Sequence, residues 1–328
     1  MINILVCGAT GFIGRNLVNI LALNKNYQIH AVSHINPCFD VPDAFNKVIW
    51  HNSDLLNSGS VAKLLVNKDI IIQAAATTSG SKDIVNTPYL HVTDNAIMNS
   101  LLLRQAMESK VSHFIFFSCT VMYQSSSIPL KEKDWDPSDE IYHKYFGVAN
   151  TKIYIEQMLD FYSRISPMKT TAIRHSNIYG PHDKFDFERS HVCGATISKA
   201  LTAQKDMVVW GSGEEERDLL YVDDLVDFVE KVILNQSKKF QIYNCGSGDK
   251  ISINELVRKI IKTSKKNLNI KHDLSKPTIK TNLQLDCGLA ELELGWKVKT
   301  SLEEGINKTI SWWEDNIDPS TLKVKKHL

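Results

Sequence analysis

Long apolar runs are missing from this chain of 328 residues. No stretch approaches the roughly 20 consecutive apolar residues that span a bilayer, and no apolar leader precedes the first predicted strand, which begins at Ile2. The six cysteines are scattered, with no CxxC pair and no short metal-like spacing. Cysteines spaced in this way are typical of reduced thiols in a cytosol. We therefore expect a cytoplasmic protein with no membrane segment and no metal site.

The chain also lacks net charge. Its 38 lysine and arginine residues against 37 aspartate and glutamate residues give a formal charge of +1. Because both signs are mixed along the chain, its electrostatics favour neither nucleic acid nor a membrane surface as a partner. The basic stretch 323–327 is interpreted as a short solvated end. A hydrophobic content of 43% is ordinary for a globular protein.

The first half of the sequence alternates short apolar runs with amphipathic stretches, which is the pattern of βαβ units in a parallel sheet. Strands are predicted at residues 2–6, 29–33, 48–50, 70–75, 114–118 and 171–174. Helices are predicted at residues 17–23, 60–65, 95–109, 150–162 and 222–234. Apolar runs without polar alternation indicate strands that helices cover on both faces. The expected fold class is α/β, a Rossmann-type doubly wound parallel sheet.

Beyond about residue 175 the alternation becomes irregular, and glycine-containing loops separate shorter elements. We therefore expect two lobes. Residues 1–175, with a return segment at about 205–245, form the dinucleotide-binding domain. Residues 176–204 and 246–328 form a smaller α/β C-terminal lobe that faces the substrate.

A glycine-rich loop follows the first predicted strand directly and opens a helix. Glycines permit a tight turn there and let the backbone approach a pyrophosphate at the free N–H groups of the helix. This position at the start of a βαβ unit makes the motif specific for a dinucleotide. The loop residues predicted to bind the cofactor are Gly8, Thr10, Gly11, Phe12, Ile13 and Gly14.

Three later segments extend this pattern. Residues 174–181 read R-H-S-N-I-Y-G-P, residues 217–224 read R-D-L-L-Y-V-D-D, and Lys152 lies in the segment T-K-I-Y-I-E-Q-M-L. With the G-x-x-G-x-x-G spacing, they resemble the extended branch of the short-chain dehydrogenase/reductase superfamily, the NAD-dependent epimerase/dehydratase family. G-P-H-D-K-F at 180–185, followed by S-H-V at 190–192, is most similar to the GDP-4-keto-6-deoxymannose epimerase/reductase (GDP-fucose synthase) branch. The resemblance covers essentially the whole chain.

The resemblance implies an NAD(P)-dependent oxidoreductase that acts on a nucleotide-linked sugar, GDP-linked in this branch. Hydride transfer at C4 would interconvert a hydroxyl and a ketone in the synthesis of sugars for surface polysaccharides. A 4-epimerase that returns its own hydride and a binding protein without turnover are the alternatives. The resemblance also implies a homodimer built from the helices around 95–109 and 145–162.

At the end of the second predicted strand, the acid that would hold the adenosine ribose of NAD is replaced by Ser33 and His34. Without this acid, the 2′-phosphate of NADP would not be repelled. However, no arginine adjacent in the sequence is available to bind that phosphate. NAD is the expected cofactor, and NADP stays open. The resemblance further assigns to the cofactor Asp54, Leu55, Ala74, Ala75, Ala76, Asn95, Ser118 and Lys152, several of which have a role in turns or packing as the alternative.

The catalytic segment departs from the superfamily at two positions. A serine or threonine, a tyrosine and a lysine share the proton transfers there, and the tyrosine precedes the lysine by four residues on one helical face. Lys152 matches the lysine, but Val148 stands at the tyrosine position. Cys119 stands at the hydroxyl position, and since a thiol is a weak donor, the neighbouring Thr120 is predicted to be the effective hydroxyl.

Water, Tyr145 or a group of the substrate is left to carry the proton. Tyr145 precedes Lys152 by seven residues, which in a regular helix separates the two by about 10 Å along the axis. It can serve only if the helix start is distorted or if it binds substrate from a neighbouring place, and a packing tyrosine is the alternative. The predicted catalytic residues are Lys152, Thr120, Cys119 and Tyr145.

On the substrate side, a guanidinium at Arg217 suits a nucleotide diphosphate because its fork pairs two oxygens at once. His191 matches an epimerisation acid/base of the branch, but Val121 stands where the branch has the partner cysteine. Epimerisation at C3 or C5 is therefore left without support, and His191 either binds a hydroxyl or phosphate or packs in a loop. The predicted substrate-binding residues are Ser79, Gly80, Asn177, His191, Arg217 and Lys280.

Overall fold

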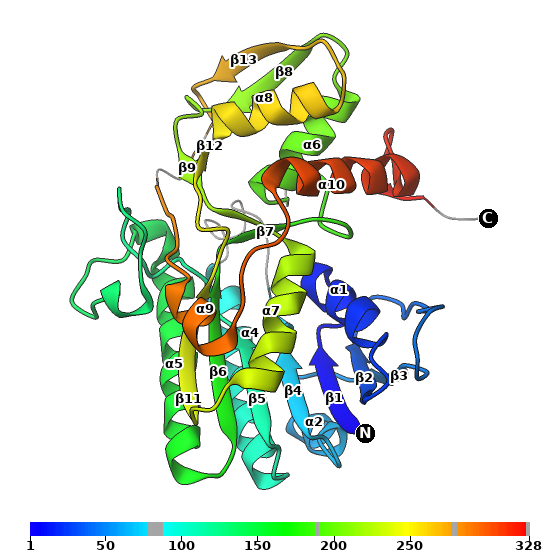
Figure 1. The fold of residues 1–328 in the computed structure, drawn as a ribbon, viewed down its shortest axis with the longest axis vertical. Helices are drawn as coiled ribbons and strands as arrows, with labels where there is room; N and C mark the ends of the chain where they lie inside the picture. The colour runs from blue at the N-terminus through cyan, green and yellow to red at the C-terminus, as the bar shows by residue number, and fades with distance from the viewer. Residues whose placement is uncertain (78–87, 188–189, 277, 279–280, 326–328) are drawn as a thin grey trace.

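The computed structural model describes residues 1–77, 88–187, 190–276, 278 and 281–325. Its main body is a parallel sheet of seven strands in the order β11-β6-β5-β4-β1-β2-β3. The chain enters the sheet at β1, winds outward to β3, and then winds from β4 to the opposite edge (Figure 1). The expected doubly wound α/β fold is confirmed. The strands are β1 (Ile2–Cys7), β2 (Tyr27–Ser33), β3 (Ile49–Asn52), β4 (Ile70–Gln73), β5 (His113–Phe117), β6 (Lys169–His175) and β11 (Phe240–Cys245).

Helices cover both faces of the sheet (Figure 1). One face packs against α1 (Phe12–Leu21), α7 (Val222–Asn235) and α9 (Gly288–Leu294). The other packs against α2 (Ser58–Leu64), α4 (Pro88–Glu108) and α5 (Phe146–Ile165). Side chains alternate between faces along a strand, so Val6 lies in the first apolar cluster and Leu5 in the second. Burial on both sides is the reason that these strands are apolar throughout.

The smaller lobe contains α6 (Val192–Thr202), α8 (Ile253–Thr263) and α10 (Leu302–Asn316), which share a third apolar cluster. Short strands pair around them: β8 (Asp206–Trp210) with β13 (Asn269–Asp273), and β9 (Glu216–Arg217) with β12 (Ile251–Ser252). β7 (Asn177–Tyr179) pairs with β10 (Leu219–Tyr221) where the chain passes between the lobes (Figure 1). The remaining elements are the 3-10 turns η1 (Glu132–Asp134) and η2 (His143–Tyr145) and the strand pair β14 (Ile317–Asp318) and β15 (Lys323–Val324).

The lobe boundaries differ from the predicted ones in two places. The return segment was expected from residue 205, but β8 pairs with β13 in the smaller lobe, and the chain rejoins the main body at α7 and β11. Conversely, α9 was expected in the smaller lobe but belongs to the main body, where it buries Ala290 and Leu294 in the apolar cluster around α1 and α7. A helix of seven residues is too short to show a periodicity in the sequence.

The longest described helix, α4, has 21 residues and packs along α5. No helix in the described ranges is both long enough and apolar enough to cross a bilayer. The surfaces of α4 and α5 expose several large apolar side chains, each more than 40% accessible: Tyr89, Leu90, Ile97, Phe146, Tyr154, Phe161 and Ile165.

Candidate functional site

The glycine-rich loop joins β1 to α1 and approaches the end of β4. Gly8 has a φ of +71°, and a Cβ there would lie 2.7 Å from Ala75 Cα. A Cβ on Gly14 would lie 2.1 Å from the carbonyl oxygen of Gly8. Gly11 is the N-cap of α1 and places no side chain over the helix end. Only glycine fits these contacts, and the first-turn N–H groups of α1 can receive a phosphate.

Two residues assigned to the cofactor are held by the protein itself. The Asn95 amide bonds to both backbone groups of Thr77, with Oδ1 accepting from the N–H at 3.1 Å and Nδ2 donating to the carbonyl at 3.0 Å. Nδ2 also donates to His91 O at 2.6 Å. The amide of Asn95 therefore fixes the loop after β4. Ser118 is fully buried, and its hydroxyl donates to Glu156 rather than lining the site.

The other assigned cofactor residues lie at the carboxyl ends of the parallel strands. Ala74, Ala75 and Ala76 follow β4 beside the glycine loop, and Ala74 N donates to Cys7 O at 3.2 Å. Asp54 accepts a hydrogen bond from Leu56 N at 2.9 Å and so forms the turn after β3, next to the buried Leu55.

A cation that the sequence did not reveal lies beside the segment after β2. Ser33 is buried at the end of β2, and His34 is exposed. Arg15 of α1 stacks on Phe39, with 4.2 Å between the guanidinium carbon and the ring centroid. Its Nε is buried without a hydrogen-bond partner among the described residues. The sequence motifs did not indicate Arg15, because it lies 18 positions before Ser33 in the sequence and comes close to this segment only when the chain is folded.

A cavity of about 450 Å³ lies between the main body and the smaller lobe. Phe12 and Ile13 of the cofactor loop border one part of it, and Lys199 and Trp210 of the smaller lobe border another. The structure brings together here six of the residues predicted for catalysis and substrate binding: Cys119, Thr120, Tyr145, Asn177, His191 and Arg217. Ser79, Gly80 and Lys280 lie outside the described residues.

Tyr145 lines this cavity from the N-terminal end of α5. Tyr145 ends the 3-10 turn η2 and is the N-cap of α5. Because residues 146–152 are regular helix, Tyr145 stays about 10 Å from Lys152 along the axis, and it faces the cavity from this neighbouring place. Burial raises the pKa of Tyr145, and the charge of Arg217 opposes this rise. Val148 lines the same cavity without a group that can transfer a proton.

Lys152 is not among the described residues that line the cavity. Its Nζ donates to Phe117 O at 2.7 Å and lies 4.5 Å from the centroid of the Phe116 ring. Burial lowers the pKa of Lys152, and the nearby Cys119 and Glu156 oppose that change. The ammonium is thus fixed at the carboxyl end of β5, next to the segment that carries Cys119 and Thr120.

A buried network holds that segment in place. Ser118 Oγ donates to Glu156 Oε1 at 2.5 Å, and Glu156 Oε2 pairs with Arg174 Nη2 at 2.6 Å. Arg174 Nη1 donates to the Tyr123 hydroxyl at 3.0 Å, which donates in turn to Asn244 Oδ1 at 2.8 Å. The network connects α5, which carries Lys152, to the ends of β5, β6 and β11.

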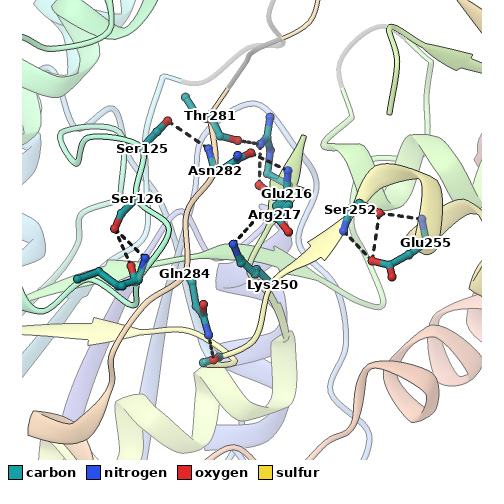
Figure 2. Close-up of polar contacts among 12 residues, drawn as sticks. Ser125, Ser126, Glu216, Arg217, Lys250, Ser252, Glu255, Thr281, Asn282 and Gln284 are labelled. Carbon is teal, nitrogen blue, oxygen red and sulfur yellow. Dashed lines mark hydrogen bonds and ion pairs between the residues drawn. The ribbon is translucent and has the colours of Figure 1, made fainter. Parts of the chain in front are cut away.

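Arg217 projects from β9, and the protein already contacts its guanidinium (Figure 2). Nη1 donates to Thr281 O and, at 2.8 Å, to Glu216 O. Burial lowers the pKa of Arg217. His191 is the N-cap of α6, and burial lowers its pKa as well. Asn177 Nδ2 donates to Asp218 O at 3.2 Å.

His175 also lines the cavity and was not predicted. Its Nδ1 donates to Ser176 O at 2.7 Å, and burial lowers its pKa to about 4. The ring is therefore neutral near pH 7, and Nε2 carries the lone pair. The available signal was its place directly after Arg174 at the end of a buried strand.

Comparison with known proteins places the chain among sugar-nucleotide enzymes. Residues 4–246 match the model of the NAD dependent epimerase/dehydratase family. The chain is 28% identical over 317 residues to a GDP-L-colitose synthase of Yersinia pseudotuberculosis, covering 94% of this chain and 97% of the relative. It is 31% identical over 278 residues to a GDP-L-fucose synthase of Sinorhizobium fredii, covering 80% of this chain and 85% of the relative. Its fold is similar to that of a UDP-glucose 4-epimerase of Thermotoga maritima, with a TM-score of 0.83, 24% identity, and coverage of 96% of this chain and 99% of that one.

Proposed function

The chain belongs to the NAD dependent epimerase/dehydratase family, and we propose that it transfers a hydride at C4 of a GDP-linked sugar, interconverting a ketone and a hydroxyl. It is an NAD-dependent enzyme that modifies a nucleotide sugar. The relatives named GDP-L-colitose synthase and GDP-L-fucose synthase support GDP as the nucleotide. The UDP-sugar epimerase structure, at 24% identity, informs the fold alone.

One observation carries this proposal. Tyr145, Cys119 and Thr120 line the same cavity as Arg217, and the cofactor loop borders it at Phe12. A cavity of about 450 Å³ is within the range of small-molecule sites. The residues to which we assign proton transfer and diphosphate binding therefore share one space with the cofactor loop, and this supports hydride transfer to a bound nucleotide sugar.

The residues divide the work as follows. NAD, when bound on the glycine loop, supplies or accepts the hydride. Tyr145 gives the proton to the C4 oxygen or takes it away, in place of the tyrosine that Val148 replaces. Thr120 or Cys119 orients that oxygen, and Lys152 fixes the nicotinamide ribose. Arg217 binds the diphosphate, and Asn177 and His191 bind the nucleotide sugar.

We do not extend the proposal to epimerisation at C3 or C5. Val121 lines the cavity where the branch would need the cysteine that works with the histidine matched by His191. A valine side chain has no proton to transfer. His191, whose pKa is lowered by burial, is left to bind a hydroxyl or a phosphate oxygen.

The decisive experiment incubates the purified protein with a GDP-4-keto-6-deoxy sugar and NADH or NADPH. We expect stoichiometric loss of reduced cofactor and a product heavier by two hydrogens. Isomerised sugar without net cofactor consumption would instead establish a 4-epimerase with internal hydride return. Binding of sugar nucleotide and cofactor without any product would establish a binding protein.

We also propose that the protein is a homodimer through α4 and α5. Large exposed apolar side chains such as Phe146 and Phe161 on α5 and Ile97 on α4 would be buried in such an interface. Light scattering coupled to gel filtration should give twice the mass of one chain. The proposal would be contradicted if the unaltered protein had the mass of one chain and Phe161→Glu left that mass unchanged.

A further inference from the structure

A strap formed by residues 281–286 connects the smaller lobe to α9 and the main body (Figure 2). Leu130 N donates to Gln284 O at 2.9 Å, and Asp286 N donates to Leu130 O at 2.8 Å. On its other side, Gln284 Nε2 donates to Gly248 O at 2.6 Å. The strap thus lies between the segment that follows β5 and the elements that carry Arg217.

Asn282 is the residue of this strap that links β9 to the segment after β5. Its side-chain Oδ1 accepts a hydrogen bond from the backbone N–H of Glu216 at 3.0 Å. Its backbone N–H donates to Ser125 Oγ at 3.2 Å (Figure 2), and its carbonyl accepts from Ser126 N at 3.0 Å. Its side chain therefore contacts β9, while its backbone contacts the segment that begins with Cys119 and Thr120.

Arg217 depends on this contact because β9 has only two residues. One edge of β9 pairs with β12, and Asn282 supplies an acceptor to Glu216, the residue before Arg217. The preceding strap residue, Thr281, accepts from the guanidinium through its carbonyl. Two adjacent strap residues therefore hold both the backbone and the side-chain end of this short strand.

We infer that Asn282 is a positioning residue for nucleotide-sugar binding, which sets Arg217 in register with the Cys119–Thr120 segment. This inference rests on the proposed function, in which Arg217 binds the diphosphate. If the register is lost, the diphosphate binds more weakly, while the groups around the reacting carbon stay in place. The effect should therefore fall on KM for the sugar nucleotide far more than on kcat.

The test compares three variants by calorimetric titration with GDP and with NADH. Asn282→Ala removes the acceptor from Glu216 N and should weaken GDP binding about fivefold to tenfold, as expected for the net contribution of one hydrogen bond. Asn282→Asp keeps the acceptor and should restore most of the affinity. Gln284→Ala is the matched control, since that amide lies on the same strap and donates to Gly248 O rather than bonding to β9. NADH binding should be equal in all of them.

The outcomes separate this inference from the function beneath it. If Arg217→Ala loses GDP binding but Asn282→Ala keeps it, Arg217 binds the diphosphate without help from Asn282, and the inference alone is overturned. Equal weakening by Asn282→Ala and Gln284→Ala, or no rescue by Asn282→Asp, would show a general disturbance of the strap and also overturn it. If the unaltered protein binds neither GDP nor inorganic pyrophosphate, both the inference and the proposed function are wrong.

Discussion

Arg174 and Glu156 form a buried ion pair, with 2.6 Å between Nη2 and Oε2 and side chains that are only 1% and 4% exposed. Glu156 lies one helical turn after Lys152 on α5, and Arg174 lies near the end of β6. Because both charges are out of water, each depends on the other for compensation. The pair therefore ties the helix that carries the lysine to the strand that opens the substrate motif.

Glu156→Gln should destabilise the protein strongly. It leaves the Arg174 guanidinium buried without its counter-charge, which costs about 3–5 kcal/mol of unfolding free energy. The matched control is Glu108→Gln in the exposed pair with Arg104, where the side chains are 43% and 70% accessible and the expected cost is below about 1 kcal/mol. Urea unfolding curves measure both, and equal losses would show that burial does not set the value of the ion pair.

Asp183 should make the protein less stable as pH rises. Burial raises its pKa from 3.8 to about 7, and its Oδ2 has no hydrogen-bond partner among the described residues. Between these two values the folded state binds more protons than the unfolded state, so stability falls with rising pH through that window. Asp183→Asn removes this titration. The unfolding free energy of the variant, relative to that of the unaltered protein, should therefore rise by on the order of 3 kcal/mol between about pH 5 and pH 8.

The comparison uses the difference between Asp183→Asn and the unaltered protein at each pH, since other groups titrate identically in both. Melting temperatures at the two pH values are sufficient. Glu108→Gln, which changes an exposed carboxylate on α4, is the control. A constant difference between variant and unaltered protein would mean that Asp183 is ionised in the folded state.

His30 should act in the opposite direction. Its Nδ1 lies 3.0 Å from Nε2 of His51, and burial, with the charges of Lys68 and His51, lowers its pKa from 6.5 to about 4. The unfolded chain then binds more protons between these values, so stability present above about pH 6.5 is lost as pH falls towards 4. His30→Gln should flatten this part of the stability curve in acid unfolding followed by circular dichroism. An unchanged slope would contradict the assignment.

The sheet could be predicted from the sequence because its strands are buried on both faces. Uniform apolar runs such as 114–117 leave little choice of structure, and the predicted strands match the observed ones within about two residues. The side-chain direction at a strand end could not be predicted in the same way. Ser118 and Cys119 are neighbours, yet one bonds to Glu156 and the other lines the cavity, because successive side chains point to opposite sides.

The cavity residues could be predicted wherever a motif fixed them, as for Asn177 and Arg217. Contacts made through the backbone left no such signal. Asn282 binds Glu216 N, Ser125 and Ser126, which are far from it in the sequence. Asn95 matched a family position, but its amide is hydrogen-bonded to Thr77. That contact depends on the path of the loop after β4, which the local sequence does not determine.

Tyr145→Phe tests the central element of the proposed chemistry. The hydroxyl is the only group removed, so kcat should fall by about 10²–10⁴-fold, the usual contribution of a positioned acid or base, with little change in KM or in NADH binding. Tyr154→Phe is the control, because that side chain is 47% exposed on α5.

Val148 offers a second, stricter test of the same site. It lines the cavity at the position where the superfamily has its tyrosine, four residues before Lys152 and therefore on the same helical face. Val148→Tyr, placed in the Tyr145→Phe background, should restore part of the lost kcat, because a phenol then returns to the cavity from the regular helix. Retention of full activity by Tyr145→Phe alone would exclude Tyr145 as the proton carrier. His175 also lines the cavity and its neutral ring has a lone pair on Nε2, so a loss of kcat in His175→Gln would then identify it as the proton carrier.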